Sequence, residues 1–201
     1  VAEDFVSQGI QVTDLSPINE PQWDWADGQE GCHYEPDEVA VLMGKFATEM
    51  QKRNTSYKLS GMETGQLSWD YNDYLFKFFE NEAVNAYCDT FAGHSYWLDG
   101  NKNEKANFGN TFKEKYPGKV FEMSEWCELP LQIDSKTIDS GLHMANVIIE
   151  DLTLLNAVSW QSWTAFNEDG LLYEDNGEIK KFNRYHAFRQ FTSFIRPGMT
   201  R

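Results

Sequence analysis

Apolar and polar positions follow one another along the chain in two repeating patterns, one typical of helices and one typical of strands. From Pro36 to Met50 apolar side chains recur at helical spacing, and Pro36-Asp37-Glu38 supplies an acidic first turn that favours a helix start. Short apolar runs bounded by polar residues and glycine, such as residues 58–63, predict strands instead.

The two patterns alternate about five times along the chain. The expected strands are residues 11–16, 58–63, 90–96, 119–124 and 157–163. The expected helices are residues 1–9, as the end of a helix, and then 36–50, 71–79, 108–115, 139–155 and 183–194. This order indicates parallel βαβ units, in which catalytic groups lie where strands end and loops begin. Because no repeat or long Pro/Gly linker interrupts it, residues 1–201 are interpreted as one α/β domain.

The composition is that of a folded domain rich in aromatic side chains. A chain of 201 residues can form one sizeable core, and 41% hydrophobic residues separate it from disordered acidic polymers. The aromatic content of 15% is high for this length. Aromatic rings can serve as flat platforms for sugars, although core packing is their commoner use. Composition therefore permits carbohydrate binding without indicating it.

Charge and cysteine content argue against several classes of protein. The net charge of -15 repels a phosphate backbone, so nucleic acid is not an expected partner, and the simplest use of this charge is a solvated surface. No stretch approaches the roughly 20 apolar residues of a membrane span. Val1-Ala2-Glu3-Asp4 lacks the features of a signal peptide, which is therefore absent or lies upstream. Cys32, Cys88 and Cys127 are widely spaced and match neither a disulfide framework nor a zinc site.

Two glutamates follow predicted strands and are candidates for catalysis. Glu20 lies in Asn19-Glu20-Pro21, where the proline favours an extended backbone at Glu20. Glu125 follows the strand at 119–124. An isolated glutamate at a strand end is usually a solvated loop residue. Two glutamates at strand ends of one barrel converge on its mouth, and glycoside hydrolysis requires such a pair of carboxyl groups.

The motifs around these glutamates resemble those of the (β/α)8 glycoside hydrolases of clan A, and more narrowly glycoside hydrolase family 30. The matching segments are Ser16-Pro17-Ile18-Asn19-Glu20-Pro21-Gln22-Trp23, Gly93-His94-Ser95-Tyr96, Ser124-Glu125-Trp126-Cys127, Ser159-Trp160-Gln161-Ser162-Trp163 and the Phe-Ile-Arg-Pro-Gly end of residues 191–198. The family contains glucosylceramidases, xylanases and endo-β-1,6-galactanases. The resemblance spans nearly the whole chain.

The resemblance implies a role for each matching residue. Glu20 corresponds to the acid/base and Glu125 to the nucleophile of a retaining mechanism that needs no cofactor and no metal. Asn19 would hydrogen-bond the 2-hydroxyl of the sugar at the cleavage point. Tyr96 would hold the nucleophile, and Trp163 would be the platform under that sugar. Glu20 is expected to have a raised pKa before reaction, and Glu125 to be ionised.

Five further residues have open assignments. His94 and Cys127 fall where the family lines its pocket, but His94 is equally a structural histidine, and we favour a buried small hydrophobe for Cys127. Glu63 either hydrogen-bonds substrate hydroxyls or is a solvated loop carboxylate. Trp23 and Trp25 either bind sugars beyond the cleavage point or clamp the loop after Glu20 against the barrel.

The run from Asn19 to Trp25, followed by Gln29-Glu30-Gly31, looks most like the endo-β-1,6-galactanase branch. The alternatives within the family are a β-1,6-glucanase, a xylanase or a glucosylceramidase. The family's polymeric substrates imply an extracellular or periplasmic location, with a polysaccharide or oligosaccharide as partner.

The chain departs from the family in containing about five of the eight strand-helix units. The first three strands and the β-sandwich side domain of the family are missing, so we expect a partial barrel that belongs to a longer protein. An open barrel is expected to expose an apolar edge and an apolar interior, which favours pairing with another chain. The oligomeric state is left open.

Three other classes of protein are alternatives to a glycoside hydrolase. A carbohydrate-binding protein without catalysis would keep the tryptophans and lose a catalytic carboxylate, whereas both glutamates are present. A metal-dependent hydrolase needs His and Asp ligands at strand ends, and of His33, His94, His143 and His186 at most His94 lies at one. A purely structural protein would tolerate loss of both glutamates.

Overall fold

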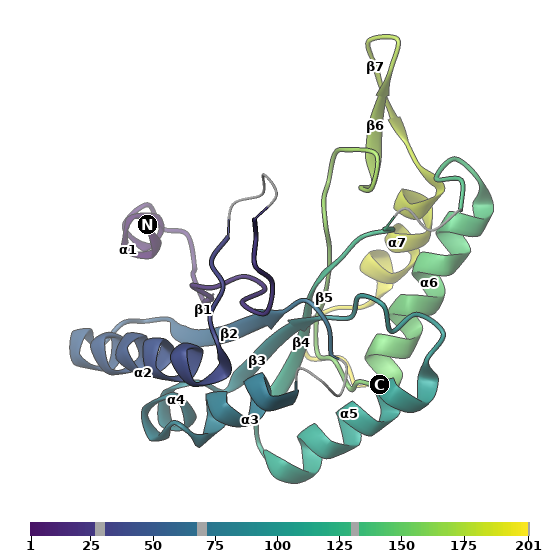
Figure 1. The fold of residues 1–201 in the computed structure, drawn as a ribbon. Helices are drawn as coiled ribbons and strands as arrows, with labels where there is room; N and C mark the ends of the chain where they lie inside the picture. Colours follow the sequence, from purple (N-terminus) through teal and green to yellow (C-terminus); the bar gives the residue numbers. More distant parts are fainter. Residues whose placement is uncertain (27–30, 68–71, 130–132, 201) are drawn as a thin grey trace.

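A curled sheet of five parallel strands forms the centre of the fold. The computed structural model describes residues 1–26, 31–67, 72–129 and 133–200. The strands are β1 (Asp14–Leu15), β2 (Lys58–Thr64), β3 (Thr90–His94), β4 (Val120–Trp126) and β5 (Trp160–Ser162). They lie side by side in sequence order, and each neighbouring pair is parallel (Figure 1). The prediction of a partial (β/α)8 barrel is confirmed.

Helices connect the strands and cover the outer side of the sheet (Figure 1). They are α1 (Ala2–Ser7), α2 (Pro36–Arg53), α3 (Asn72–Glu80), α4 (Glu82–Tyr87), α5 (Lys102–Lys115), α6 (Ile138–Thr153) and α7 (Asn183–Phe194). Each strand is followed by at least one helix, which confirms the five units. No helix in the described ranges combines the length and the apolar composition needed to cross a membrane.

Local sequence explains where the longest helix begins and ends. Glu35 and Glu38 form a reciprocal capping box at the start of α2, with Pro36 in the first turn. Asn54 ends the helix in a left-handed conformation, which asparagine tolerates better than most residues. The acidic first turn is followed by Lys52 and Arg53 in the last turn, so both ends complement the helix dipole.

Aromatic side chains fill the space between the sheet and the helices. Phe91 on β3 and Phe121 on β4 are register partners, and their rings stack with centroids 6.3 Å apart. Phe112 from α5 packs against both rings, and Phe79 from α3 packs against Phe91. These phenylalanines are at most 4% exposed. The high aromatic content is therefore used largely in this core.

A buried ion pair joins two helices to the ends of two strands. Lys105 on α5 and Asp151 on α6 are both fully buried, with Nζ 2.8 Å from Oδ1. The other carboxylate oxygen of Asp151 accepts hydrogen bonds from the Ser95 hydroxyl at 2.8 Å and the Trp160 indole at 2.9 Å. Because Ser95 follows directly after β3 and Trp160 begins β5, one carboxylate fixes both strand ends from the outer side.

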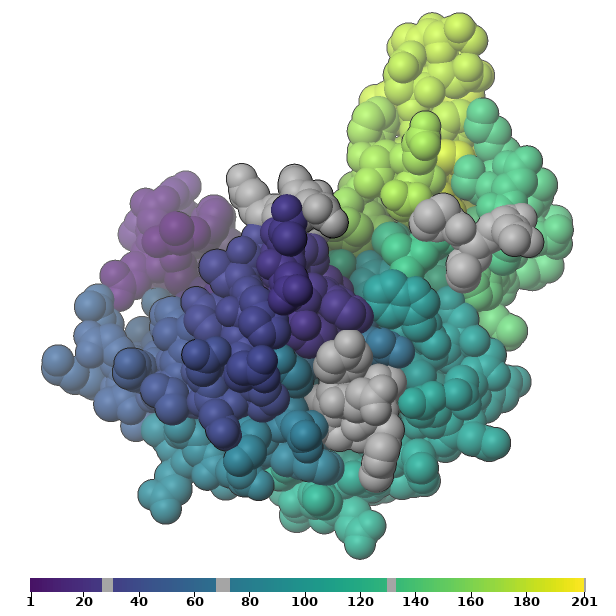
Figure 2. Space-filling view, viewed as in Figure 1, coloured from purple at the N-terminus to yellow at the C-terminus, as the bar shows by residue number. Residues whose placement is uncertain are grey.

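Two elements differ from the sequence predictions. The helix α4 was not predicted, and Asn81 starts it by accepting hydrogen bonds from two backbone amides of its first turn. The hairpin of β6 (Leu172–Asp175) and β7 (Glu178–Lys181) was not predicted either. Figure 2 shows this yellow-green part of the chain standing out from the rest of the molecule. Its turn is Asn176-Gly177, both with positive φ, which is a sequence signal for a hairpin.

The expected boundaries were less accurate than the order of the elements. The first strand is confined to Asp14–Leu15, the helix expected from Phe108 begins at Lys102, and the last strand is Trp160–Ser162. The start of the helix expected at 71 lies outside the described residues. Asn101 accepts a hydrogen bond from the Glu104 amide, so it caps α5 nearly two turns earlier than the apolar pattern indicates.

The expectation of an apolar barrel interior is wrong. At the amino ends of the strands the inner face carries Asp14, Ser60, Glu122 and Ser159, all lining one cavity. Apolar residues of the same strands, such as Phe121, point outward to the helices and are buried there. Side chains therefore alternate between the two faces of the strands, and it is the outer face that carries the apolar core.

Gly109 lies where α5 packs closely against the end of α6. A Cβ at Gly109 would overlap with the backbone carbonyl oxygen of Leu154, just after α6. We expect Gly109→Ala to lower the free energy of unfolding by about 1–3 kcal/mol, although alanine is the better helix former. Asn110→Ala, at an exposed position of the same helix, is the matched control and should be neutral. Urea unfolding midpoints measure both, and equal midpoints for the two variants would contradict this packing.

Candidate active site

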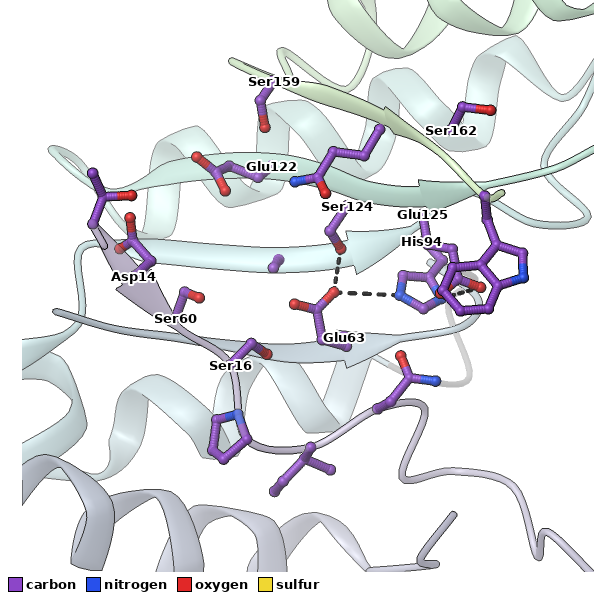
Figure 3. A pocket seen from close by; sticks show the side chains of 17 residues that line it. Asp14, Ser16, Ser60, Glu63, His94, Glu122, Ser124, Glu125, Ser159 and Ser162 are labelled. Carbon is purple, nitrogen blue, oxygen red and sulfur yellow. Dashed lines mark hydrogen bonds and ion pairs between the residues drawn. The ribbon is translucent and has the colours of Figure 1, made fainter. Parts of the chain in front are cut away.

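A cavity of about 700 Å³ opens along the inner face of the sheet and reaches its carboxyl-terminal edge. At that edge it is lined by Glu63, His94 and Glu125 (Figure 3). Asn19 and Trp163 line the same cavity. Five of the ten predicted site residues thus line one cavity. They come from the segment after β1 and from the ends of β2, β3, β4 and β5.

Register shifts in the sheet direct two of the glutamates into the cavity. The pairing of β2 with β3 shifts between Met62 and Thr64, which places the irregularity at Glu63. The pairing of β3 with β4 shifts between Gly93 and His94, so that Glu125 rather than Ser124 is opposite His94. An extra residue of this kind bends the strand and re-aims its side chain. Glu63 and Glu125 therefore line the cavity despite the alternation of their strands.

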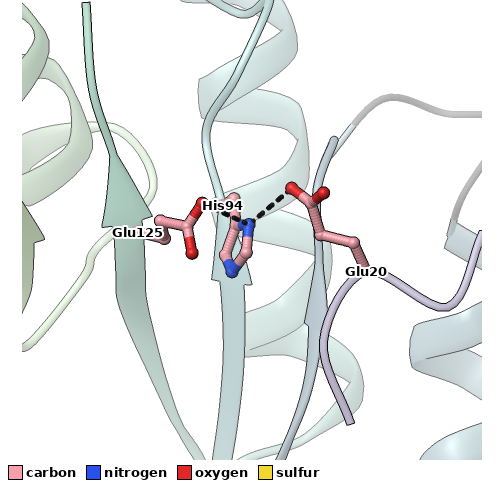
Figure 4. Close-up of side chains that lie close together, drawn as sticks. All are labelled: Glu20, His94 and Glu125. Atoms are coloured by element: carbon pink, nitrogen blue, oxygen red, sulfur yellow. Dashed lines mark hydrogen bonds and ion pairs between the residues drawn. The ribbon is translucent and has the colours of Figure 1, made fainter. Parts of the chain in front are cut away.

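Glu20, His94 and Glu125 lie together at the centre of the site (Figure 4). His94 Nδ1 is 2.8 Å from Glu20 Oε1 and 3.8 Å from Glu125 Oε1. One ligand atom from each of the three residues lies within 4.8 Å of the others. The backbone amide of Glu20 donates to the carbonyl oxygen of Glu63 at 2.8 Å, which ties the Glu20 loop to the end of β2. The two glutamates that the sequence singled out are thus close neighbours.

Glu63 is a third carboxylate in contact with His94. Its Oε2 lies 3.3 Å from His94 Nε2 and accepts a hydrogen bond from the Ser124 hydroxyl. Burial raises the pKa of Glu63, but the hydrogen bonds from His94 and Ser124 outweigh it and lower the pKa overall. Glu63 is therefore an ionised, partly buried residue of the cavity and not a solvated loop carboxylate.

His94 carries the positive charge of the site. Burial alone would lower its pKa, but hydrogen bonds to Glu20 and Glu63 and the charge of Glu125 raise the pKa to about 9. The side chain is 1% exposed. At neutral pH both ring nitrogens are protonated, so Nδ1 donates to Glu20 and Nε2 donates to Glu63.

Tyr96 and Cys127 surround the carboxylate of Glu125. The Tyr96 hydroxyl donates to Glu125 Oε1 at 3.0 Å and lies 3.5 Å from Cys127 Sγ. Burial raises the pKa of Glu125 above its ordinary value, and the charge of His94 and the Tyr96 hydrogen bond offset this only in part. Burial also raises the pKa of Cys127 to about 11, so this buried thiol stays neutral.

The three predicted tryptophans occupy different environments. Trp163 is 51% exposed and lines the cavity after β5. Trp25 donates its indole N–H to the carbonyl oxygen of Glu20 at 2.9 Å, as a clamp on the loop would. Trp23 packs edge-on against Trp97, with ring centroids 5.7 Å apart. Of the loop residues noted in the sequence, Gln29 and Glu30 lie outside the described residues.

Glu20, His94 and Glu125 are also the side chains that could hold a metal ion among the described residues. A cation there would have to displace the proton on His94 Nδ1, which the neighbouring carboxylates hold firmly. The same three groups suit proton transfer without such a displacement, because a protonated nitrogen already lies 2.8 Å from a carboxylate oxygen.

Sequence reasoning missed Ser124 and the pair of Lys105 and Asp151. Ser124 was quoted as part of the Ser-Glu-Trp motif, but its hydrogen bond to Glu63 depends on the register shift beside it. The polar alternation of Glu122 and Ser124 along β4 was a signal that this face is not apolar. For Lys105 and Asp151, which are 46 positions apart, the sequence contains no comparable signal.

The raised pKa of His94 predicts how stability depends on pH. A histidine whose pKa rises from 6.5 to about 9 on folding stabilises the protein fully below 6.5, and this contribution is lost as the pH rises through 9. The free energy of unfolding should therefore fall between pH 7 and pH 10 by more in the native protein than in His94→Gln. Urea unfolding at both pH values measures it, and parallel losses in the two proteins would show that His94 is not charged.

Comparison with known proteins places this chain in a family. The model of O-glycosyl hydrolase family 30 matches residues 1–176. A curated relative, the endo-β-1,6-galactanase of Hypocrea rufa, is 26% identical, and the match covers 94% of this chain and 38% of the relative.

Solved structures agree in fold. A conserved exported protein from Bacteroides fragilis superposes with a TM-score of 0.81 at 22% identity, covering 98% of this chain and 49% of that protein. A family 30 endoxylanase from Clostridium papyrosolvens gives a TM-score of 0.76 at 21% identity, covering 98% of this chain and 45% of the enzyme. The chain spans less than half the length of each of these relatives. Its match to the family model over residues 1–176 shows that the chain belongs to O-glycosyl hydrolase family 30.

Proposed function

We propose that this protein is a retaining β-glycosidase in which Glu125 is the nucleophile and Glu20 the acid/base. The observation that carries the proposal is the approach of the two carboxylates on either side of His94, with atoms from all three residues within 4.8 Å of one another. Retaining enzymes hold their carboxyl groups about 5–5.5 Å apart, whereas inverting enzymes separate them by about 6.5–9.5 Å to admit a water molecule. The close approach supports retention.

In the first step Glu125 attacks the anomeric carbon and the bond to the leaving oxygen breaks. Glu20 donates a proton to that oxygen, so the leaving sugar departs as an alcohol. The short contact between His94 Nδ1 and Glu20 Oε1 places a proton one transfer away from this carboxylate. Tyr96, whose hydroxyl donates to Glu125, would hold the nucleophile in line for attack.

In the second step water releases the sugar from Glu125. Glu20, now a carboxylate, removes a proton from the water, whose oxygen bonds to the anomeric carbon as the bond to Glu125 breaks. The imidazolium of His94 lies 3.8 Å from Glu125 Oε1 and favours its departure as a carboxylate. Asn19 and Trp163 line the same cavity and would hold the sugar at the cleavage point by hydrogen bonding and stacking.

The proposed substrate is a β-1,6-galactan, and the proposed location is outside the cytoplasm. The named activity of the Hypocrea rufa relative supports the linkage, and the description of the Bacteroides fragilis protein as exported supports the location. Glu63, ionised and facing the cavity, is a candidate to bind substrate hydroxyls. A β-1,6-glucan, a xylan and a glucosylceramide are the competing substrates.

Hydrolysis by the full-length protein tests the proposal. β-1,6-galactan, β-1,6-glucan and glucuronoxylan are incubated with the native protein and with Glu125→Gln, Glu20→Gln and the exposed control Glu114→Gln, and NMR follows the anomeric configuration. We expect cleavage of galactan with retained configuration, a loss of at least roughly 1,000-fold in kcat for Glu125→Gln and roughly 100-fold or more for Glu20→Gln. Glu114→Gln, on the solvent side of α5, should match the native protein.

Other outcomes separate the alternatives. Inverted products would refute the double-displacement mechanism, and full activity of either site variant would refute the residue assignment. A native protein that cleaves none of the three polymers but binds one of them would be a carbohydrate-binding protein without catalysis.

A further inference from the structure

An unusual backbone conformation marks four residues at the carboxyl ends of the strands. Seven non-glycine residues in the described ranges have positive φ, and three of them are asparagines, which tolerate this region. The other four are Glu20, Trp25, Glu63 and Trp97, with φ between 42° and 58°. Bulky residues are strained in this region, and such strain concentrates at functional sites.

Three of these four residues already belong to the site. Glu20 and Glu63 contact His94, and Trp25 donates to the Glu20 carbonyl oxygen. Trp97 directly follows Tyr96, yet it is not among the residues that line the cavity. Its side chain is 54% exposed. A tryptophan with a strained backbone and a half-exposed indole contributes little to the stability of the fold. This points to a role in binding a ligand.

Neighbouring rings hold the Trp97 indole in place. Trp23 contacts it edge-on at 5.7 Å with an interplanar angle of 79°, and Tyr96 lies 5.8 Å away at 55°. Trp97 therefore connects the loop after Glu20 with the residue that donates to Glu125. A fixed, half-exposed indole is a ready platform, since little side-chain freedom is lost when a ligand stacks on it.

The position of Trp97 distinguishes it from Trp163. Trp97 follows β3, the central strand of the sheet, two strands from either open edge (Figure 1). Trp163 follows β5, so the two exposed indoles lie on opposite sides of β4 and Glu125. Because Trp97 is packed against the loop of Glu20, the group that protonates the leaving oxygen, it lies on the side of the departing half of the substrate.

We propose that Trp97 is a stacking platform for the sugar on the leaving-group side of the cleaved bond. This inference rests on the proposed function and narrows it to substrates whose leaving group is itself a sugar, as in a polysaccharide. A pyranose offers an apolar face to the indole and hydroxyl groups to exposed carboxylates such as Asp24, next to Trp23. An anionic ligand would be repelled by the same carboxylates.

Two substrates that share a cleaved sugar and differ in leaving group test this platform. The full-length protein, Trp97→Ala, Trp97→Phe and the control Phe194→Ala are assayed on a β-1,6-galacto-oligosaccharide and on β-galactosyl fluoride, whose leaving group has no face to stack on an indole. Phe194 is 71% exposed at the end of α7. We expect Trp97→Ala to lower kcat/KM for the oligosaccharide roughly tenfold, mainly through KM, and kcat/KM for the fluoride by less than about twofold. Trp97→Phe, which keeps a flat ring, should recover most of the loss.

Equal losses on both substrates, or no loss on either, would overturn the proposal. If the native protein cleaves neither substrate, the proposed function fails. Calorimetric titration with the same oligosaccharide then tests whether Trp97 binds sugar, independently of catalysis. Weaker binding by Trp97→Ala with unchanged binding by Phe194→Ala supports the platform, and equal affinity of all variants refutes it.

Discussion

One buried positive charge holds the site together. Without the imidazolium of His94, the largely buried carboxylates of Glu20, Glu63 and Glu125 would face one another with no positive charge between them. Mutual repulsion would then either raise their pKa values, so that they bind protons, or push the carboxylates apart. With the charge in place, Nδ1 donates to Glu20 in the loop after β1 and Nε2 donates to Glu63 on β2, while Glu125 lies 3.8 Å from Nδ1. The arrangement of the site is therefore an electrostatic consequence of the residue at the end of the central strand.

The histidine in turn depends on contacts from the other side of the sheet. In β3 and the residues after it, inward side chains alternate with outward ones, and Ser95 lies between His94 and Tyr96. Its hydroxyl is bonded to Asp151, whose second oxygen is paired with Lys105. A buried pair of this kind adds little net stability by itself, but removing one partner leaves an uncompensated charge. Its main effect is to fix the segment from which two side chains reach both glutamates.

The sequence predicted the order of the elements and the pair of glutamates, and it failed where long-range contacts decide. Period and composition were sufficient for α2 and α7, because their apolar stripes are local properties. The hairpin had its Asn176-Gly177 signal, yet short polar strands give weak periodicity. The inward turn of Glu63 and the bond from Ser124 accompany register shifts between neighbouring strands, which no single segment encodes. His94 could be noted as a candidate, but its charge follows from three residues far apart in the chain.

The polar inner face restricts what can complete the sheet. Asp14 and Glu122 have no hydrogen-bonding or ionic partner among the described side chains, and burial together with the charge of Asp14 raises the pKa of Glu122. If strands with apolar inner positions completed the sheet, these carboxylates would be buried without hydrogen-bonding partners. The free energy of removing them from water would exceed the gain from hydrophobic contact. A second copy of the same face would bring like charges together. Elements that pack against Asp14 and Glu122 must therefore carry hydrogen-bond donors or a positive charge. These two carboxylates thus restrict which segments can complete the inner face of the sheet.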